Sequence, residues 1–326
     1  MATPVHGGPR AWTTHGRHDV YWLASGDLVL GAVPTLGGRL LAIRKDGREM
    51  LWRNADLITE ELQPADGHVP APHDGVLGDW HNYGGDKTWP APQGWSSASE
   101  WAGPPDPVLD SGAYTADVVT TPDVVTLTMT SAPDPRTGLQ LTRTLTVGDV
   151  SGFELRLTAR NTADHDVTWS LWNVTQLAGG GTVEIAVDDA FTEPVELVDG
   201  TGVPSWVRTD RGSVEIGPQD VVGKLGLPHA TGRMSYRHDD LRVVWTFDVD
   251  DAATYPDGGS RVEVWMEHPQ PAPLASLDGL DPPDRIVECE VLSPLRTLAP
   301  GDTMALAVDV SIENVADRGE DSTCSK

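Results

Sequence analysis

The chain has 326 residues, with 49 acidic and 23 basic side chains, so its formal charge is −26. A negative field of this size repels nucleic acids and anionic membranes, which argues against both as partners. Only two cysteines are present, the first residues lack the pattern of a signal peptide, and no apolar run of 18 residues occurs. We therefore expect a cytoplasmic protein without a disulfide framework.

The composition favours strands over helices. Glycine (34 residues) and proline (26) are abundant, there are 12 tryptophans, and no segment has a long helical period of apolar residues. We expect residues 1–18 to be irregular, residues 19–313 to form one domain, and residues 314–326 to form a polar, disordered tail. No internal repeat is visible, which argues against a propeller.

The first strands of the domain are expected between residues 19 and 53. The pair Asp46-Gly47 predicts a hairpin between residues 39–44 and 49–53. Residues 55–107 then show few apolar alternations and many prolines. A connection this long inside a compact domain usually has a function, so we expect a functional segment here.

Apolar and polar residues alternate again after residue 114. In residues 139–147 the period of two is clear, as in a strand with one buried face. Similar strands are expected at 114–120, 124–130, 153–161, 167–177, 182–187, 232–237, 241–248, 261–267, 286–291 and 303–312. About 16 to 20 strands of ordinary length predict an all-β fold in which two large, twisted antiparallel sheets pack face to face.

Residues 78–93 combine glycines, prolines, aromatic residues and charged residues, which we interpret as an ordered loop rather than a buried strand. The tryptophans would offer flat apolar faces, and the polar residues would offer directed hydrogen bonds. That mixture suits a sugar-like ligand. Alternatively, the tryptophans only cover the edge of a sheet. The candidate contact residues are Trp80, His81, Asn82, Asp86, Lys87 and Trp89, with Trp95 just beyond.

Two late strands carry the acids that are the best candidates for catalysis. Alternation places Glu263 and Glu267 on one face of the first strand, and Glu288 and Glu290 on one face of the second. If the strands are neighbours, several like charges share one surface and require a cation. A carboxylate kept ionised beside a histidine or second carboxyl group of raised pKa makes a base and acid pair. Otherwise, these glutamates lie on a solvated face. The available positive residues are Lys87, Lys224, His81 and His229.

Residues near these strands are further candidates. Lys224 stands in an apolar segment, which suggests a buried charge partner. The turn at 255–258 either places Tyr255 and Asp257 at the rim of a site or is plain turn chemistry. The histidines and cysteines have no metal-ligand spacing, so no metal site is predicted. The sequence also has no glycine-rich phosphate loop and no nucleophile elbow, and no cofactor is expected.

Several short segments, in order from about residue 20 to 313, resemble the galactose mutarotase-like superfamily. The resemblance is narrower to an uncharacterised branch of it, the DUF4380 family. The matching segments are 33–39, 84–90, 172–176, 223–226, 255–258, 288–294 and 298–301. The resemblance implies a β-supersandwich with a carbohydrate-type pocket on the concave face of one sheet.

The resemblance also implies residue roles. In aldose mutarotases a glutamate removes the proton of the anomeric hydroxyl while a histidine protonates the ring oxygen. Here the candidates are Glu290 or Glu263 as base and His81 as acid. Arg39, Lys87 and Lys224 would orient hydroxyls or stabilise negative charge. The sequence departs from the well-studied mutarotases at the strand that contains Trp172 and Gln176, which has no histidine.

The leading hypothesis is an enzyme that resembles aldose 1-epimerases and acts on a sugar or a polyhydroxylated or cyclic acetal metabolite by general acid/base catalysis. One alternative is a carbohydrate-binding protein without turnover, which would use Trp80, Trp89 and Trp95 as stacking platforms. Another is a lyase or cyclase of a secondary-metabolite pathway, which would use the same carboxylates with Lys87 or Tyr255. The expected partner is a small, sugar-like molecule in every case.

Overall fold

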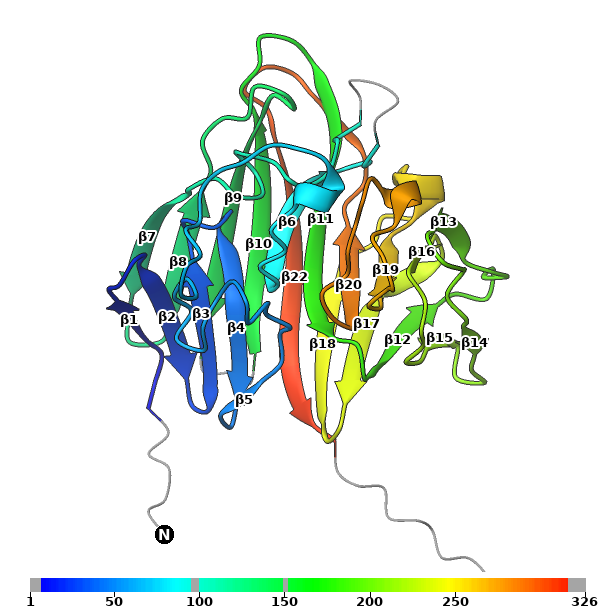
Figure 1. Cartoon of the computed structure of the whole chain (residues 1–326), viewed down its shortest axis with the longest axis horizontal. Coiled ribbons are helices and arrows are strands. Elements are labelled where there is room, and N and C mark those ends of the chain that lie inside the picture. Colours follow the sequence, from blue (N-terminus) through cyan, green and yellow to red (C-terminus); the bar gives the residue numbers. More distant parts are fainter. Residues whose placement is uncertain (1–6, 95–99, 149–151, 316–326) are drawn as a thin grey trace, which may run out of the picture.

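The computed structural model describes residues 7–94, 100–148 and 152–315, and in this part of the chain it contains 22 strands and three short 3-10 helices. The strands form two large sheets (Figure 1), in which neighbouring strands run antiparallel. The predicted all-β supersandwich is therefore confirmed. None of the helices among the described residues is long and apolar enough to cross a membrane.

The larger sheet has twelve strands. Its order is β1 (Arg10–Thr14), β2 (Val20–Ser25), β3 (Leu28–Val33), β4 (Arg39–Lys45), β6 (Asp86–Ala91), β11 (Val167–Ala178), β20 (Ile286–Leu292), β19 (Val262–Glu267), β16 (Gly223–Leu227) and β13 (Val195–Asp199). β5 (Arg48–Glu49) pairs with β4, and β21 (Arg296–Leu298) pairs with β11. β11, from the middle of the chain, thus joins β6 of the first third to β20 of the last third.

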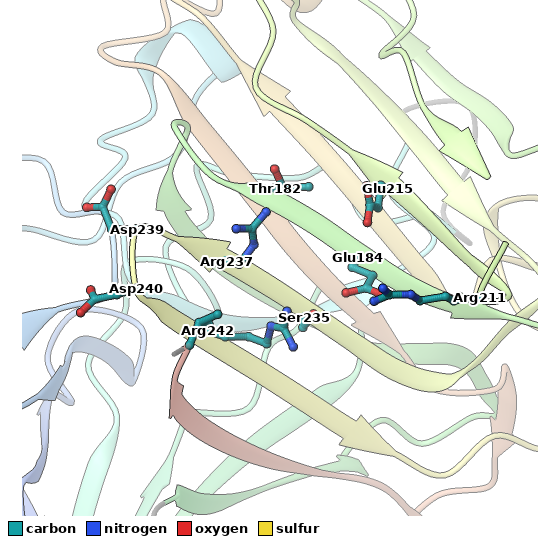
Figure 2. A pocket seen from close by; sticks show the side chains of 10 residues that line it. Thr182, Glu184, Arg211, Glu215, Ser235, Arg237, Asp239, Asp240 and Arg242 are labelled. Carbon is teal, nitrogen blue, oxygen red and sulfur yellow. The ribbon is translucent and has the colours of Figure 1, made fainter. Parts of the chain in front are cut away.

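The second sheet has ten strands. Its order is β14 (Val207–Arg208), β15 (Ser213–Ile216), β12 (Thr182–Val187), β17 (Ala230–His238), β18 (Leu241–Phe247), β22 (Thr303–Asn314), β10 (Gly152–Asn161), β9 (Leu139–Val147), β8 (Val125–Thr130) and β7 (Thr115–Thr120). The helices are η1 (Leu77–Asp79), η2 (Asp257–Gly259) and η3 (Ala275–Leu277). Figure 2 shows a hollow over β12, β15, β17 and β18, with arginine and carboxylate side chains around it.

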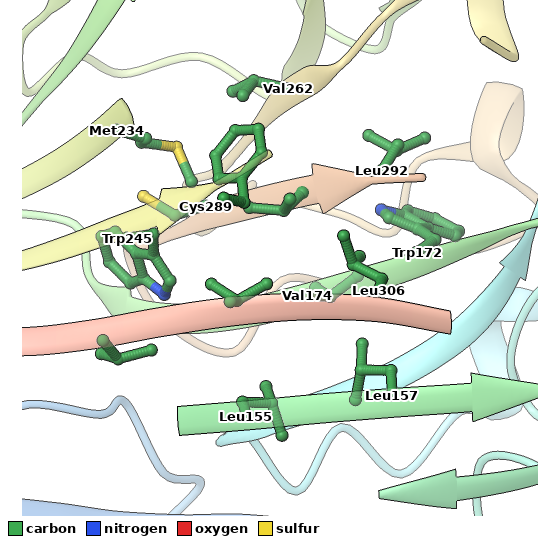
Figure 3. Packing of buried hydrophobic residues seen from close by; sticks show 14 of the residues in the cluster. Leu155, Leu157, Trp172, Val174, Met234, Trp245, Val262, Cys289, Leu292 and Leu306 are labelled. Atoms are coloured by element: carbon green, nitrogen blue, oxygen red, sulfur yellow. The ribbon is translucent and has the colours of Figure 1, made fainter. Parts of the chain in front are cut away.

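The core lies between the two sheets and follows from the period of two. In β9 the residues alternate between buried and half-buried, as the sequence predicts. Leu155 and Leu157 of β10 and Leu306 of β22 pack in one cluster with Val262 of β19 and Cys289 of β20 (Figure 3). Each such aliphatic side chain contributes roughly 1.5–3 kcal/mol when fully buried. This cluster joins the sheets.

The predicted hairpin at Asp46-Gly47 is confirmed, because β4 pairs with β5 across these two residues. Their φ angles are 52° and 76°. A two-residue hairpin of this kind requires positive φ at both central positions, which aspartate tolerates and glycine favours.

Two parts of the chain differ from the expectation. Residues 1–18 were expected to be irregular, but Arg10–Thr14 forms β1 and pairs with β2. This strand is exposed or half-exposed along its length, so it lacks the apolar signal of a buried strand. At the other end β22 runs to Asn314. The tail was expected at 314–326, but Asn314 belongs to β22; residues 316–326 of it, and Trp95, lie outside the described residues.

Part of the expected loop at 78–93 is instead a strand. Residues Asp86–Ala91 form β6, which is buried at each of its positions and pairs with β11. β6 pairs with β4 only at Leu40 and Asp86. Beyond this point only the β11 side of the strand requires ladder hydrogen bonds, so the strand accommodates Pro90, which lacks an N–H.

Candidate functional site

A cavity of about 300 Å³ lies on the outer face of the twelve-stranded sheet, away from the core. The core side of β19 is formed by Val262, Val264 and Met266, so the alternate residues Glu263, Trp265 and Glu267 point outward into the cavity. Loop residues close the sides. The lining residues are Leu77, Trp80, Trp89, Gln93, Pro104, Trp172, Leu197, Val198, Lys224, Asp257, Glu263, Trp265, Glu267, Leu277, Leu280, Glu288 and Glu290.

Two glutamates and one lysine form the centre of this cavity. Glu263 of β19 and Glu290 of β20 are direct cross-strand partners. Lys224 of β16 bridges them, with its Nζ 2.5 Å from Glu263 Oε2 and 2.8 Å from Glu290 Oε2. Trp172 donates its Nε1–H to Glu290 Oε2 over 2.7 Å, and its ring lies 4.2 Å from Lys224 Nζ. The predicted neighbourhood of the two acidic strands is confirmed.

The protonation of this centre is set by burial and by the shared lysine. Burial raises the pKa of Glu263 well above its usual range and also raises the pKa of Glu290, while the charge of Lys224 opposes both shifts. Burial lowers the pKa of Lys224, but the two carboxylates outweigh it and leave that pKa above its ordinary value. Two carboxyl groups that share one cation favour a state with one proton between them. Such a pair contains an acid and a base together.

A second polar group adjoins the first. Lys87 Nζ lies 3.3 Å from Glu288 Oε1, which also accepts a hydrogen bond from Gln176 Nε2 over 2.6 Å. The Lys87 ammonium stands 4.7 Å from the centre of the Trp89 ring and 5.4 Å from that of Trp80. Burial lowers the pKa of Lys87, and Glu288 opposes this shift. The rings of Trp80 and Trp89 therefore bind the Lys87 ammonium group as well as offering apolar surface.

Glu267 has no ion pair with any described residue. Its Oε1 accepts the Nε1–H of Trp265 over 2.9 Å, and its side chain is 2% exposed. Burial raises the pKa of Glu267 to about 7, with a further contribution from the negative charge of Glu288. This carboxyl group therefore titrates near neutral pH.

Five buried polar atoms around the centre have no hydrogen-bond partner among the described residues: Glu263 Oε1, Glu267 Oε2, Glu290 Oε1, Gln176 Oε1 and Trp89 Nε1. An unpartnered buried polar group costs about 1–3 kcal/mol. Gln176 Oε1 is an acceptor and Trp89 Nε1 is a donor, whereas each carboxyl oxygen accepts when its group is ionised and donates when it carries the proton. A ligand rich in hydroxyl or amine hydrogens would satisfy them together.

The structure brings together most of the candidates from the sequence. The candidates that line the cavity are Trp80, Trp89, Trp172, Lys224, Asp257, Glu263, Glu288 and Glu290. Two further candidates, Lys87 and Gln176, bind Glu288. Burial raises the pKa of Asp257, and the charge of Lys224 opposes this. The site residues that sequence analysis missed are mainly apolar, such as Leu197, Leu277 and Leu280, and lie outside any recognisable motif.

Two candidate charges serve the interior of the fold instead. Arg39 is fully buried, forms an ion pair with Asp110, and donates from Nη1 to the Gly84 carbonyl over 3.3 Å. Asp86 points from β6 toward the ten-stranded sheet, where it forms an ion pair with Arg143 of β9. Neither side chain lines the cavity.

Three other candidates also lie outside the cavity lining. Asn82 is buried, and its Oδ1 accepts the backbone N–H of Gly84 over 3.1 Å. Tyr255 accepts the backbone N–H of Asp250 at its hydroxyl over 3.1 Å. The ring centroid of His81 lies 4.5 Å from that of His73 and 5.3 Å from that of His68, and burial lowers its pKa, with a smaller contribution from His73. His81 directly follows Trp80 but does not itself line the cavity.

The other positive and metal-binding possibilities are elsewhere. His229 binds Asp188, with 3.1 Å between Nδ1 and Oδ1. Within the described ranges, no group of three or more histidine, cysteine, aspartate or glutamate side chains is arranged to hold a metal ion. The hollow of Figure 2 contains charges of both signs and, among its lining residues, no aromatic side chain. Of its three arginines, Arg211 and Arg237 are exposed to solvent and Arg242 is half-buried.

Solved structures of the same architecture include a galactose mutarotase-like protein from Clostridium acetobutylicum, with a TM-score of 0.58 and 10% identity over 94% of this chain and 99% of that one. A putative aldose 1-epimerase from Escherichia coli has a TM-score of 0.51 and 10% identity over 94% and 100%. A TPR-domain containing protein from Parabacteroides distasonis has a TM-score of 0.58 and 12% identity over 95% of this chain, which spans half of that protein. The fold is therefore galactose mutarotase-like.

Within this fold class, residues 21–309 match the model of a family described as a domain of unknown function, DUF4380. The chain belongs to this family, as the resemblance in its sequence suggests. No curated protein matches the chain.

Proposed function

We propose that this protein is a sugar-converting enzyme that interconverts the two anomers of an aldose by general acid/base catalysis. The observation that carries the proposal is the cross-strand pair Glu263 and Glu290, bridged by Lys224. Each glutamate has one oxygen without a hydrogen-bond partner among the described residues. Both side chains line a cavity that also contains tryptophan rings.

The hydrogen bonds favour Glu290 as the base. Its Oε2 receives hydrogen from Trp172 and from Lys224, and hydrogen bonds to the charged form favour ionisation. Glu263 has the lysine but not the indole donor, and burial raises its pKa well above the usual range. Glu263 is therefore the group that carries the proton and serves as the acid. His81 had been the candidate acid, but it lies outside the cavity lining.

The reaction then needs no further component. Glu290 Oε1 takes the proton of the anomeric hydroxyl as that oxygen forms a carbonyl bond with C1, while the bond between C1 and the ring oxygen breaks. The ring oxygen takes the proton from Glu263. Rotation about the C1–C2 bond presents the other face of the carbonyl, and the reverse proton transfers close the ring. Positioned proton transfer of this kind contributes about 10²–10⁴-fold to a rate.

The surroundings support a sugar as the reactant. A volume of about 300 Å³ is at the small end of ligand pockets, which suits a monosaccharide. Trp80, Trp89 and Trp172 offer apolar ring faces beside the carboxylates. The related architectures include proteins described as mutarotase-like and as a putative aldose 1-epimerase.

The proposal is tested by the rate at which α and β anomers interconvert, measured by NMR exchange on a panel of aldoses. The wild type should accelerate at least one of them, and Glu290→Gln and Glu263→Gln should each slow that conversion by about 100-fold or more. Glu313→Gln, an exposed glutamate of β22, is the matched control and should be neutral. Wild-type rates in both active-site variants, with circular dichroism showing that they are folded, would refute the assignment.

A binding protein without turnover is the second candidate, because the tryptophans of the cavity would hold a sugar even if no proton moved. Calorimetry distinguishes the two. Measurable affinity for a sugar, together with an unchanged rate of anomer exchange in the wild type, would favour the binding protein.

A further inference from the structure

The charges of the cavity are not balanced. Five carboxyl groups line it, those of Asp257, Glu263, Glu267, Glu288 and Glu290. Lys224 bridges two of them and Lys87 binds a third, Glu288. Among the residues that line the cavity, lysine is the only basic type and there is no arginine. The lining is therefore acidic even when both lysines are charged.

Of these five groups, Glu267 and Asp257 have no ion pair among the described residues, and Glu267 is the more deeply buried of the two. Trp265 on its own strand donates a hydrogen bond to it, and the charges of Glu288 on β20 and Lys87 on β6 act on it. Lys87 is bound to Glu288, and the indole of Trp265 satisfies only Glu267 Oε1. Glu267 Oε2 has no hydrogen-bond partner among the described residues, although only 2% of this residue is exposed.

A second unpartnered acceptor belongs to Gln176, which binds Glu288 but does not itself line the cavity. Gln176 is fully buried and donates its Nε2–H to Glu288, which leaves Gln176 Oε1 unpartnered among the described residues. Glu267 Oε2 is an unpartnered acceptor on a carboxyl group that lines the cavity, so it favours a ligand group that donates hydrogen bonds. An ammonium group, with three N–H donors and a positive charge, has that chemistry.

Anionic sugars have the opposite chemistry. A phosphate or carboxylate would meet the carboxyl groups of Glu263, Glu267 and Glu290 and a single unpartnered N–H donor, Trp89 Nε1. Phosphate recognition typically uses arginine or clusters of backbone N–H groups. The lining residues give the cavity no arginine for this purpose.

We propose that the ligand of this cavity is an amine-bearing sugar whose ammonium group binds Glu267, while its anomeric carbon lies at Glu263 and Glu290. This inference rests on the proposed function for the place of the anomeric carbon. The charge preference stands on the residues around Glu267 alone.

The spacing along β19 also predicts where the amine is attached. Glu263 and Glu267 lie on the same face four residues apart, so their Cα atoms are roughly 13 Å apart at about 3.3 Å per residue. An amine on C2, directly beside the anomeric carbon, is too close to it to reach the Glu267 end. The amine therefore lies at the far end of the ligand, on C6 or on a second ring.

Calorimetric titration of the wild type with glucose, 6-amino-6-deoxyglucose, 2-amino-2-deoxyglucose and glucose 6-phosphate tests this inference. The 6-amino sugar should bind at least ten times more tightly than glucose, the 2-amino sugar should gain less, and the phosphate should bind most weakly. The preference should increase from pH 6 to pH 8 as Glu267 ionises. If the 6-amino sugar fails to bind, or binds no more tightly than glucose, the proposal is overturned.

Two variants separate this inference from the proposed function. Glu267→Gln keeps the shape of the side chain and should abolish the preference for the amino sugar over glucose. Glu290→Gln should abolish anomer conversion but keep the preference. A preference that survives Glu267→Gln contradicts the amine site, whereas an unchanged conversion rate in Glu290→Gln contradicts only the catalytic proposal. Glu313→Gln is the control for both measurements.

Discussion

Two adjacent residues of β6, Asp86 and Lys87, point to opposite faces of the twelve-stranded sheet and into two different buried polar groups. Asp86 faces the core, where both of its oxygens are bonded: Arg143 binds Oδ1, and Asn173 and Thr175 donate to Oδ2 over 2.8 and 2.6 Å. Lys87 faces the cavity, where Glu263, Glu267 and Glu290 each keep one oxygen without a partner among the described residues.

The difference separates a structural carboxylate from functional ones. Native structures leave few buried polar groups unbonded, so a cluster of exceptions calls for an explanation. Both groups are buried and charged, and burial alone does not distinguish them. The distinction lies in whether the protein itself satisfies each oxygen, which predicts that the two groups respond in opposite ways to the same substitution.

The largest effect is expected from Asp86→Asn. This variant leaves the buried guanidinium of Arg143 without its counterion between the two sheets. Breaking a buried ion pair by removing one partner typically costs about 3–5 kcal/mol. The free energy of unfolding, measured by urea denaturation, should fall by that amount. Asp117→Asn, at an exposed position of β7, should change it by less than about 0.5 kcal/mol. If both substitutions lowered the free energy of unfolding equally, Asp86 would not be a structural carboxylate.

Glu267→Gln should have the opposite sign. Because the folded-state pKa of Glu267 is about 7, above its ordinary value, the folded protein binds more protons than the unfolded chain between about pH 4.5 and 7. Wild-type stability therefore falls as the pH rises through this window. The variant lacks this loss and should be more stable than the wild type at pH 8 by about 2–3 kcal/mol, but not at pH 4.

Denaturation curves at both pH values measure this effect. An equal difference at pH 4 and pH 8 would show that Glu267 does not titrate in this window. The ion pair between Asp86 and Arg143 in the core is unaltered in this variant, so a difference between the variant and the wild type does not come from that pair.

The smallest effect is expected from Trp80→Ala. Trp80 is only partly buried, donates to Asp110 over 2.9 Å, and lies beside Lys87 in the cavity wall. Loss of one aromatic face should weaken sugar binding by about 1 kcal/mol, or roughly five- to tenfold. Unfolding should change little in comparison. Calorimetry with the sugar that the wild type binds gives the answer, and an unchanged affinity would remove Trp80 from the binding surface.

Much of the fold follows from local patterns, but the strand order does not. The alternation in 139–147 predicts β9, and the alternation of Glu263 and Glu267 with Val262 and Val264 predicts which side of β19 faces out. β6 was missed because its charged residues and Pro90 resemble a loop. A strand of this composition is stable only because other strands supply partners for the charged side chains on both of its faces.

The candidate site likewise contains residues that local patterns predict and residues that they do not. Glu263, Glu288 and Glu290 are found from alternation because strand geometry alone places them. Arg39 and Asp86 stand in equally distinctive segments, yet their partners Asp110 and Arg143 are 71 and 57 residues away, and no local pattern predicts such pairs. Leu197 of the edge strand β13, Leu277 of η3 and Leu280 just after η3 reach the cavity from segments whose positions depend on the completed fold.

The cavity has a floor of adjacent strands, β11, β20, β19 and β16, whereas Leu77, Gln93, Pro104, Leu277 and Leu280 come from the connections around it. Hydrogen-bonded strands in mid-sheet tolerate little change, and connecting segments tolerate insertions and exchange. Selection can therefore remodel the rim for a new reactant one connection at a time, while the proton-handling residues beneath keep their register.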